Sequence, residues 1–185
     1  MSGETPADVI AFWRDAGPDR WFQKDEAERG AFDEVVRQRF LALHERAAAG
    51  ELKDWESSAE GALALLLLLD QFPRNMFRGT LQAFAADPLA RAIMAAALLK
   101  GFDAQVPSDL RQFFYLPFEH PEDMTDQERG LALYTAAGDE DGLKWAKLHA
   151  DIIRRFGRFP HRNKILGRRS TPEEQQFLDE GGFAG

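Results

Sequence analysis

The chain has no cysteine, and this absence limits its chemistry first. Disulfides and thiolate nucleophiles are excluded, and a reducing compartment is expected. The N-terminus also lacks a basic start followed by an apolar stretch, so no signal peptide is visible. The longest apolar run, residues 62–69, is far shorter than the ~20 residues that cross a bilayer. We therefore expect a cytoplasmic protein that does not enter a membrane.

Several familiar catalytic and cofactor motifs are missing as well. There is no HExxH zinc motif, and the four histidines lack the paired spacing of zinc ligands. No glycine-rich phosphate loop of the form GxGxxG or GxxxxGK[ST] occurs, and no GxSxG nucleophile motif. We therefore expect no metal and no cofactor, and α/β-hydrolase chemistry is excluded.

Acidic residues are absent from one stretch of an otherwise acidic protein. The net charge of −8 argues against a nucleic-acid-binding protein. Between residues 152 and 172 there are no acids but seven cations, namely Arg154, Arg155, Arg158, Arg162, Lys164, Arg168 and Arg169. Such a segment attracts anions, although it is also explained as a solvated stretch that pairs with the acidic remainder.

Alternating apolar and polar residues, the pattern of a strand, are not sustained anywhere, whereas helical signals recur. Short connections between successive helices predict an all-α protein of about eight helices, with antiparallel helical hairpins stacked in an array. With 185 residues and no long Pro/Gly/Ser linker, the chain fits one domain, residues 1–185.

Helix starts are indicated by hydroxyl residues followed three positions later by an acid. Thr5, Ser57, Thr125 and Thr171 are the expected caps. Further helices are expected over residues 32–50, from the Asp-Pro pair at 87–88 to Gly101, over 108–115, and over 143–157.

The leucine-rich segment 65–69 ends on Asp70, followed by Gln71, Phe72, Pro73, Arg74 and Asn75. A carboxylate near the C-terminal end of a helix faces the negative end of the dipole, and Pro73 is expected to stop the helix. Asp70 therefore needs a cation, for which Arg74 and the 154–162 arginines are candidates.

A similar string recurs downstream, because Phe159-Pro160-His161-Arg162-Asn163 matches residues 72–75 with one histidine inserted. One interpretation of both loops is structural: their polar side chains bond to groups at the helix ends and hold them in place, an arrangement that we call a polar lock. The functional alternative is a shared pocket in which guanidinium groups and an imidazole bind a phosphate or carboxylate. The predicted ligand-binding residues are Asp70, Arg74, Asn75, Tyr115, His120, Arg158, His161, Arg162 and Asn163.

His149 lies on the apolar stripe of its helix, where a core role and a site role both remain open. Glu119 and Glu122 flank His120 in a proline-bounded segment, and such acids either do acid–base work or are merely solvated.

Three strings together resemble a known family. They are residues 70–75 (DQFPRN), 115–120 (YLPFEH) and 156–163 (FGRFPHRN), within a likeness that runs from Val9 to Glu174. The chain resembles a bacterial domain family of unknown function with a tetratricopeptide-like helical fold. The resemblance implies a fold and no activity. Pro121 departs from it, because a serine is expected after the histidine.

Three hypotheses follow. The first is a pocket, formed by segments 70–75 and 154–163, that binds a small anionic molecule or the acidic end of a peptide. The second is a hydrolase or transferase with His120 or His161 as general base. The third is a protein-interaction scaffold with a protein partner.

Overall fold

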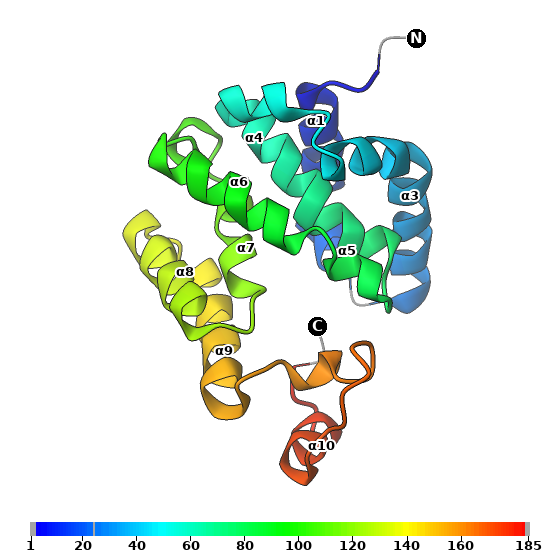
Figure 1. Cartoon of the computed structure of the whole chain (residues 1–185), viewed down its shortest axis with the longest axis vertical. Coiled ribbons are helices and arrows are strands. Elements are labelled where there is room, and N and C mark those ends of the chain that lie inside the picture. Colours follow the sequence, from blue (N-terminus) through cyan, green and yellow to red (C-terminus); the bar gives the residue numbers. More distant parts are fainter. Residues whose placement is uncertain (1–2, 24, 184–185) are drawn as a thin grey trace. The chain divides into compact units, whose positions relative to one another are not determined.

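The structure is a computed structural model that describes residues 3–23 and 25–183, and within this part every regular element is helical. The prediction of an all-α protein is confirmed (Figure 1). The contacts divide the chain into two compact units, residues 1–117 (unit 1) and 118–185 (unit 2). That these form one domain stays a prediction.

Unit 1 holds six α-helices and several short helical turns. The α-helices are α1 (Pro6–Ala16), α2 (Pro18–Trp21), α3 (Glu26–Ala48), α4 (Ala59–Leu66), α5 (Phe72–Met76) and α6 (Asp87–Leu99). The 3-10 turns are η1 (Lys53–Ser57), η3 (Leu81–Phe84), η4 (Asp103–Gln105) and η5 (Arg111–Phe114). Helix α7 (Leu116–Glu119) contains the boundary between the units.

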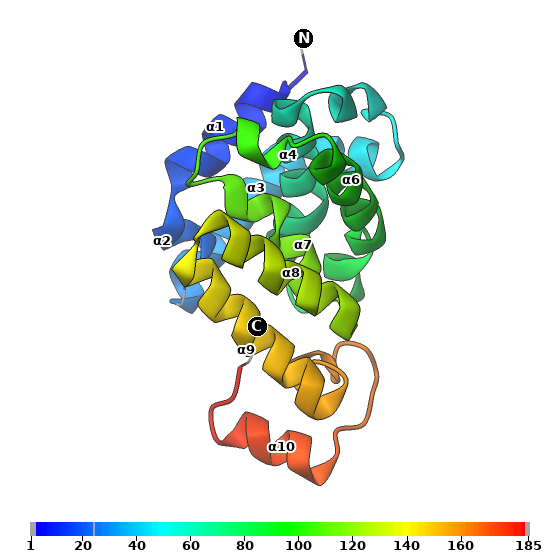
Figure 2. The same ribbon diagram turned by 90° about the vertical axis from the view of Figure 1, so that its left-hand side faces the viewer.

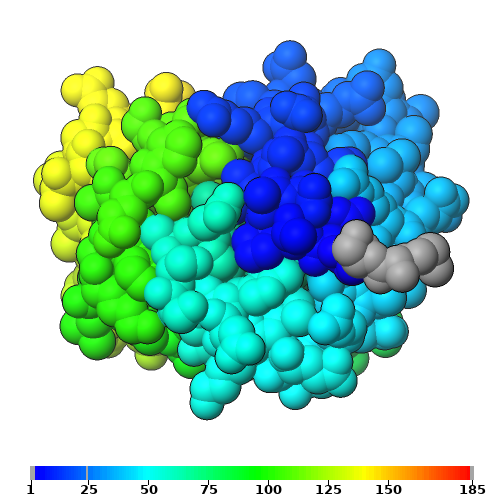
Figure 3. All heavy atoms as spheres, turned by 90° about the horizontal axis from the view of Figure 1, so that it is seen from above, coloured from blue at the N-terminus to red at the C-terminus, as the bar shows by residue number. Residues whose placement is uncertain are grey.

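The core of unit 1 is built around α4, whose last six residues are all buried. Its neighbours include α1, α6 and η1, while α3 packs on α5. Trp13 of α1, Phe40 of α3 and Phe72 of α5 add aromatic rings, with centroids of Phe40 and Phe72 4.8 Å apart. In Figure 3 α1 lies at the surface beside the chain near residue 50. Because α4 and the turn after it lie in this core, the apolar run of residues 62–69 is buried throughout.

The leucine helix does not end at Pro73, and this corrects the sequence prediction. A π-helical turn, η2 (Leu67–Gln71), follows α4 and leads directly into α5, with Pro73 in its first turn. Proline has no N–H, so a carbonyl of the preceding turn is left without its helical partner. The wide turn disturbs the backbone hydrogen bonds, and His44 donates from Nδ1 to the Leu68 carbonyl at 2.8 Å.

Unit 2 contains α8 (Met124–Ala137), α9 (Glu140–Phe156), the 3-10 turn η6 (Pro160–Arg162) and α10 (Pro172–Asp179). Helices α8 and α9 form a hairpin and lie side by side in Figures 1 and 2. Gly138 makes the reversal possible, because its φ of 67° is in the left-handed region that other residues avoid. Ile152, Ile153 and Phe159 form the buried core of this unit.

The cap predictions are partly right. Thr5 and Thr171 form capping boxes, as expected. The caps expected at Ser57 and Thr125 are wrong, since Ser58 and Asp123 accept the first amide hydrogen bonds of α4 and α8. Ser58 and Asp123 are the residues directly before α4 and α8, and from this position a side chain reaches the amides of the first turn.

The helix expected over 108–115 is shorter than predicted. The chain makes the 3-10 turn η5 and then continues into α7 through Pro117, rather than stopping before it. Pro117 is the second residue of α7, where a proline is tolerated.

One segment, Leu81–Leu99, is long and apolar enough to cross a membrane by length and composition alone, with 33% of it buried. A core helix of a protein that never meets a membrane passes the same criterion. The prediction that the protein does not enter a membrane therefore stays a prediction.

Candidate functional site

Asp70 lies in the π-turn, is almost wholly buried, and pairs with Arg74 one helical turn on. The guanidinium Nη1 of Arg74 is 3.2 Å from Asp70 Oδ1 and donates to the Asp70 carbonyl at 2.6 Å. Gln71 donates to the other oxygen of the same carboxylate. Asp87 binds the fork of Arg74 with two further hydrogen bonds, at 3.0 and 2.9 Å. Burial alone would lower the pKa of Arg74, but the two carboxylates outweigh it and raise the pKa.

The other predicted residues of unit 1 also bond within the unit. Asn75 donates to Asp33 at 2.8 Å, and the Tyr115 hydroxyl donates to Asp103 at 2.8 Å. Around the π-turn the geometry is that of a polar lock.

Arg158 and Asn163 of unit 2 meet at Glu174, which is buried. Arg158 donates to both carboxylate oxygens, at 2.6 and 2.8 Å, and Asn163 donates at 3.2 Å. These hydrogen bonds, those from Arg158 first, lower the pKa of Glu174 to about 2. The two residues thus fix the start of α10.

Glu119 and His149 form the most enclosed ionisable pair of unit 2. Glu119 is 1% exposed, and its Oε2 lies 2.6 Å from His149 Nδ1. Gln127 of α8 holds the Glu119 segment by donating to the carbonyls of Glu119 and Pro121 at 2.7 and 2.9 Å. Because a carboxylate accepts here, His149 donates this hydrogen bond from Nδ1.

His161, in η6, faces the same cluster. Burial and, after it, the positive charge of Arg162 lower its pKa from 6.5 to about 4. Its Nδ1 is buried without a hydrogen-bond partner in the described part of the chain, and so is Glu119 Oε1. Both of these polar atoms without partners belong to residues that interact with His149.

Arginine and phenylalanine side chains frame these imidazoles. Arg162 donates to the His120 carbonyl at 2.7 Å and stacks over the Phe159 ring at 4.5 Å. The ring of Phe159 is 5.7 Å from that of His149 and 5.5 Å from that of His161. Phe183 lies against both imidazoles, at 4.7 and 5.3 Å. We call Glu119, His149, Phe159, His161, Arg162 and Phe183 the imidazole cluster.

Glu122 and Arg168 support the loop that carries His161. The Arg168 guanidinium donates to both oxygens of Glu122, at 2.6 and 2.9 Å, and the Phe159 amide donates to Glu122 at 2.8 Å. Burial alone would raise the pKa of Glu122, but these hydrogen bonds prevail and lower it. The loop that carries His161 is therefore held by charge-assisted hydrogen bonds.

A family model, described as a bacterial protein of unknown function (DUF924), matches residues 9–182. This chain belongs to the DUF924 family. A solved structure of a protein of unknown function from Agrobacterium tumefaciens is 52% identical to it, with a TM-score of 0.90. The match covers 95% of this chain and 97% of that one. No curated protein matches the chain.

The predicted site of this DUF924 protein is thus distributed over both units. Four of its residues lie in unit 1, namely Asp70, Arg74, Asn75 and Tyr115. His120, Arg158, His161, Arg162 and Asn163 lie in unit 2. The prediction that both sets line one pocket stays a prediction.

The sequence does not indicate the contact between Glu119 and His149. An acid in a loop and a histidine on the apolar face of a helix are each ordinary by themselves. Their pairing was not predicted. The nearest available signal was that both residues are ionisable and lie next to apolar residues.

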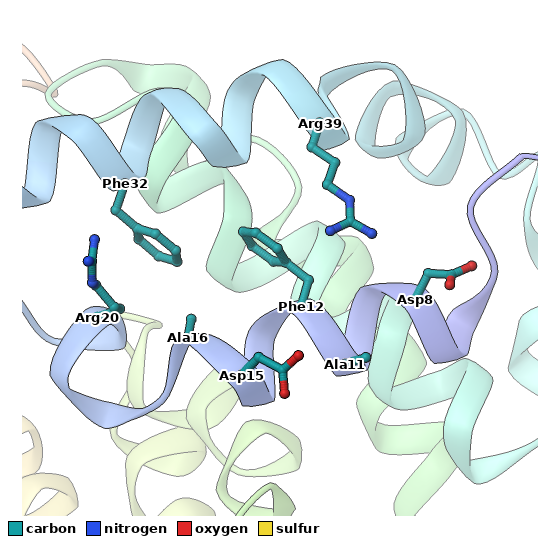
Figure 4. Close-up of a pocket in the computed structure, with 8 residues that line it drawn as sticks. All are labelled: Asp8, Ala11, Phe12, Asp15, Ala16, Arg20, Phe32 and Arg39. Atoms are coloured by element: carbon teal, nitrogen blue, oxygen red, sulfur yellow. The ribbon is translucent and has the colours of Figure 1, made fainter.

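The DUF924 chain also has a surface hollow of about 470 Å³ between α1 and α3, drawn in Figure 4. Phe12 and Phe32 stack there with ring centroids 5.8 Å apart. Two of its four charged side chains are engaged, since Arg39 pairs with Glu4 at 2.8 Å and Asp8 belongs to the α1 capping box. The imidazole cluster is therefore the stronger candidate site. In the described residues no group of three or more His, Cys, Asp or Glu is placed to hold a metal ion.

Proposed function

We propose that the protein binds a small anionic molecule at the imidazole cluster of unit 2. The observation that carries this proposal is the pair of buried atoms without partners, Glu119 Oε1 and His161 Nδ1. A buried polar atom that lacks a hydrogen bond costs about 1–3 kcal/mol. A ligand that satisfies both atoms recovers that free energy on binding.

The charges in the cluster define the ligand further. Arg162 supplies the positive charge for a carboxylate or phosphate, and its position is fixed by the hydrogen bond to the His120 carbonyl. Glu119 Oε1 accepts hydrogen bonds only, so the ligand must also carry a donor. A small anion with a neighbouring hydroxyl or amino group meets both requirements.

Calorimetric titration with glycolate and acetate tests this ligand chemistry, because the two anions differ by the hydroxyl donor. The wild type is expected to bind glycolate at least several-fold more tightly than acetate. Glu119→Gln is expected to remove that preference, because its amide can present an NH2 donor where Oε1 now accepts.

The matched control is Glu180→Gln, an exposed acid beyond α10. It should leave the preference unchanged. If the folded wild type binds neither these anions nor inorganic phosphate, the proposal is refuted.

A second function, acid–base catalysis, is favoured by the 2.6 Å contact between Glu119 and His149. A carboxylate that holds Nδ1–H orients the imidazole and strengthens Nε2 as a proton acceptor. In the described part of the chain, Nε2 has no hydrogen-bond partner. His161, with a pKa of about 4, is a weak base, and the sequence hypothesis of His120 or His161 as general base is therefore extended to His149, which the carboxylate of Glu119 orients.

Nitrogen-15 NMR of the imidazoles tests this assignment. The Nδ1–H tautomer is expected for His149 at neutral pH in the wild type, and a mixture of tautomers in Glu119→Gln. A wild-type His149 that carries its proton on Nε2 would contradict the assignment.

The further sequence hypotheses remain proposals. They are an acidic peptide as ligand, a scaffold that binds a protein partner, a cytoplasmic location, tetratricopeptide-like stacking, and a pocket lined by both predicted segments. We retain the small anion as the leading ligand because the unpartnered atoms support it directly.

A further inference from the structure

The outer face of α9 exposes two large apolar side chains one helical turn apart. Trp145 is 50% exposed and Leu148 is 37% exposed. They line a surface hollow of about 740 Å³. Scattered apolar residues are normal on a surface, but tryptophan is enriched among the residues that dominate the binding free energy of interfaces.

The charged residues of this face are arranged in a pattern with its own symmetry. Asp141, Lys144, Leu148, Asp151 and Arg155 are spaced by three, four, three and four residues, so they form one stripe along the helix. We call these five residues the α9 stripe. All of them are exposed. From the N-terminal end the signs are negative, positive, neutral, negative and positive, and in reverse order every sign is inverted.

We infer that the α9 stripe is a self-association surface for a second copy of this chain, bound antiparallel. With Leu148 on the twofold axis, Asp141 of each copy faces Arg155 of the other. Lys144 likewise lies beside Asp151 of the other copy. A parallel arrangement would place like charges together, so the charge pattern selects the antiparallel one.

The existing partners of the stripe do not oppose this arrangement. Asp151 pairs with Arg154, and Arg155 pairs with Glu173 at 2.9 Å, with all four side chains more than half exposed. Exposed pairs of this kind contribute little and exchange partners readily. One helix face is small beside the ~1,600 Å² of a standard interface, so the dimer is weak and depends on protein concentration and salt.

Sedimentation equilibrium over a concentration series, at low and at high salt, tests the inference on the full chain. The wild type is expected to rise from the monomer mass toward twice that mass at low salt, and less so at high salt. Leu148→Arg places two cations on the axis and should leave only monomer.

Leu99→Arg is the matched control, because Leu99 is 87% exposed but lies in α6. It should behave as the wild type does, and circular dichroism checks that each variant is folded. A wild type that is monomeric at every concentration overturns the inference and leaves the face for a different protein partner. An undiminished dimer in folded Leu148→Arg also overturns it.

A charge exchange tests the antiparallel geometry separately. Lys144→Glu or Asp151→Lys alone should weaken the dimer at least several-fold, because each creates like-charge contacts across the axis. The double variant restores opposite charges and should recover most of the affinity. A double variant as weak as the single ones would refute the proposed alignment.

Discussion

Replacing His161 with phenylalanine is expected to make the protein more resistant to unfolding in mild acid. The pKa of His161 is about 4 in the folded protein, against 6.5 for the free side chain, chiefly because the imidazole is buried. Between these two values the unfolded chain binds a proton that the folded protein does not. Protonation of His161 therefore favours unfolding as the pH falls from 6.5 toward 4.

The size of this effect follows from the two pKa values. Above about pH 6.5 the histidine is neutral in both states, so it makes no pH-dependent contribution to the free energy of unfolding. At about pH 5 the loss is about 2 kcal/mol, and below pH 4 it levels off at about 3 kcal/mol. His161→Phe removes the titrating group while it retains an aromatic ring beside Phe159 and Phe183.

Urea unfolding of the wild type and His161→Phe at about pH 7.5 and about pH 5 measures this contribution. The difference at the higher pH gives the pH-independent cost of the substitution. The difference at the lower pH should shift by about 2 kcal/mol in favour of the variant. Equal differences at both pH values would refute the reasoning, and so would an NMR titration that places the His161 pKa near 6.5.

Four further substitutions test the packing and the polar locks. Gly30→Ala in α3 should raise the free energy of unfolding by about 0.5–1 kcal/mol, since an added Cβ meets open space. Gly61→Ala should instead lower the free energy of unfolding by about 1–3 kcal/mol, because the new Cβ would lie 2.1 Å from the Trp55 carbonyl oxygen. Urea unfolding compares the two variants, and equal effects would contradict this packing. Arg74→Lys should lower the free energy of unfolding by about 1–3 kcal/mol in the same assay, because an ammonium cannot contact both Asp70 and the two oxygens of Asp87. An unchanged urea midpoint would count against the polar lock. Glu174→Gln should reduce the hydrogen-exchange protection of α10 at neutral pH. The wild type should lose the same protection as the pH falls from about 4.5 toward about 2, because Glu174 becomes protonated. Unchanged exchange in the variant and in the acidified wild type would argue against the Glu174 network.

Much of the fold was predictable because helix boundaries are encoded locally. The capping boxes at Thr5 and Thr171 need only a hydroxyl and an acid three residues apart, and both occur where the sequence indicated. The π-turn was not predictable, since no local signal marks it among the leucines. It depends on a hydrogen bond from His44, which lies 24 positions upstream of Leu68.

The candidate site was less predictable because its contacts join distant residues. Arg158 and Asn163 were predicted to bind a ligand, but in the structure both donate hydrogen bonds to Glu174. Glu119 and His149 are 30 positions apart, and their contact requires the α8–α9 hairpin to bring α9 beside the 119–121 segment. Composition could indicate ionisable groups but could not indicate which of them would meet.

The π-turn also fixes the rotational phase between the helical segments on its two sides. One residue of an α-helix turns the chain by about 100°, and a π-turn accommodates one residue more than an α-turn does. A relative with one leucine fewer in residues 67–69 would regain regular α-helical bonding there. Its α5 would then present another side to α3, and Asn75 would turn away from Asp33. Insertions and deletions in this short run are therefore far more consequential than exchanges of one aliphatic side chain for another.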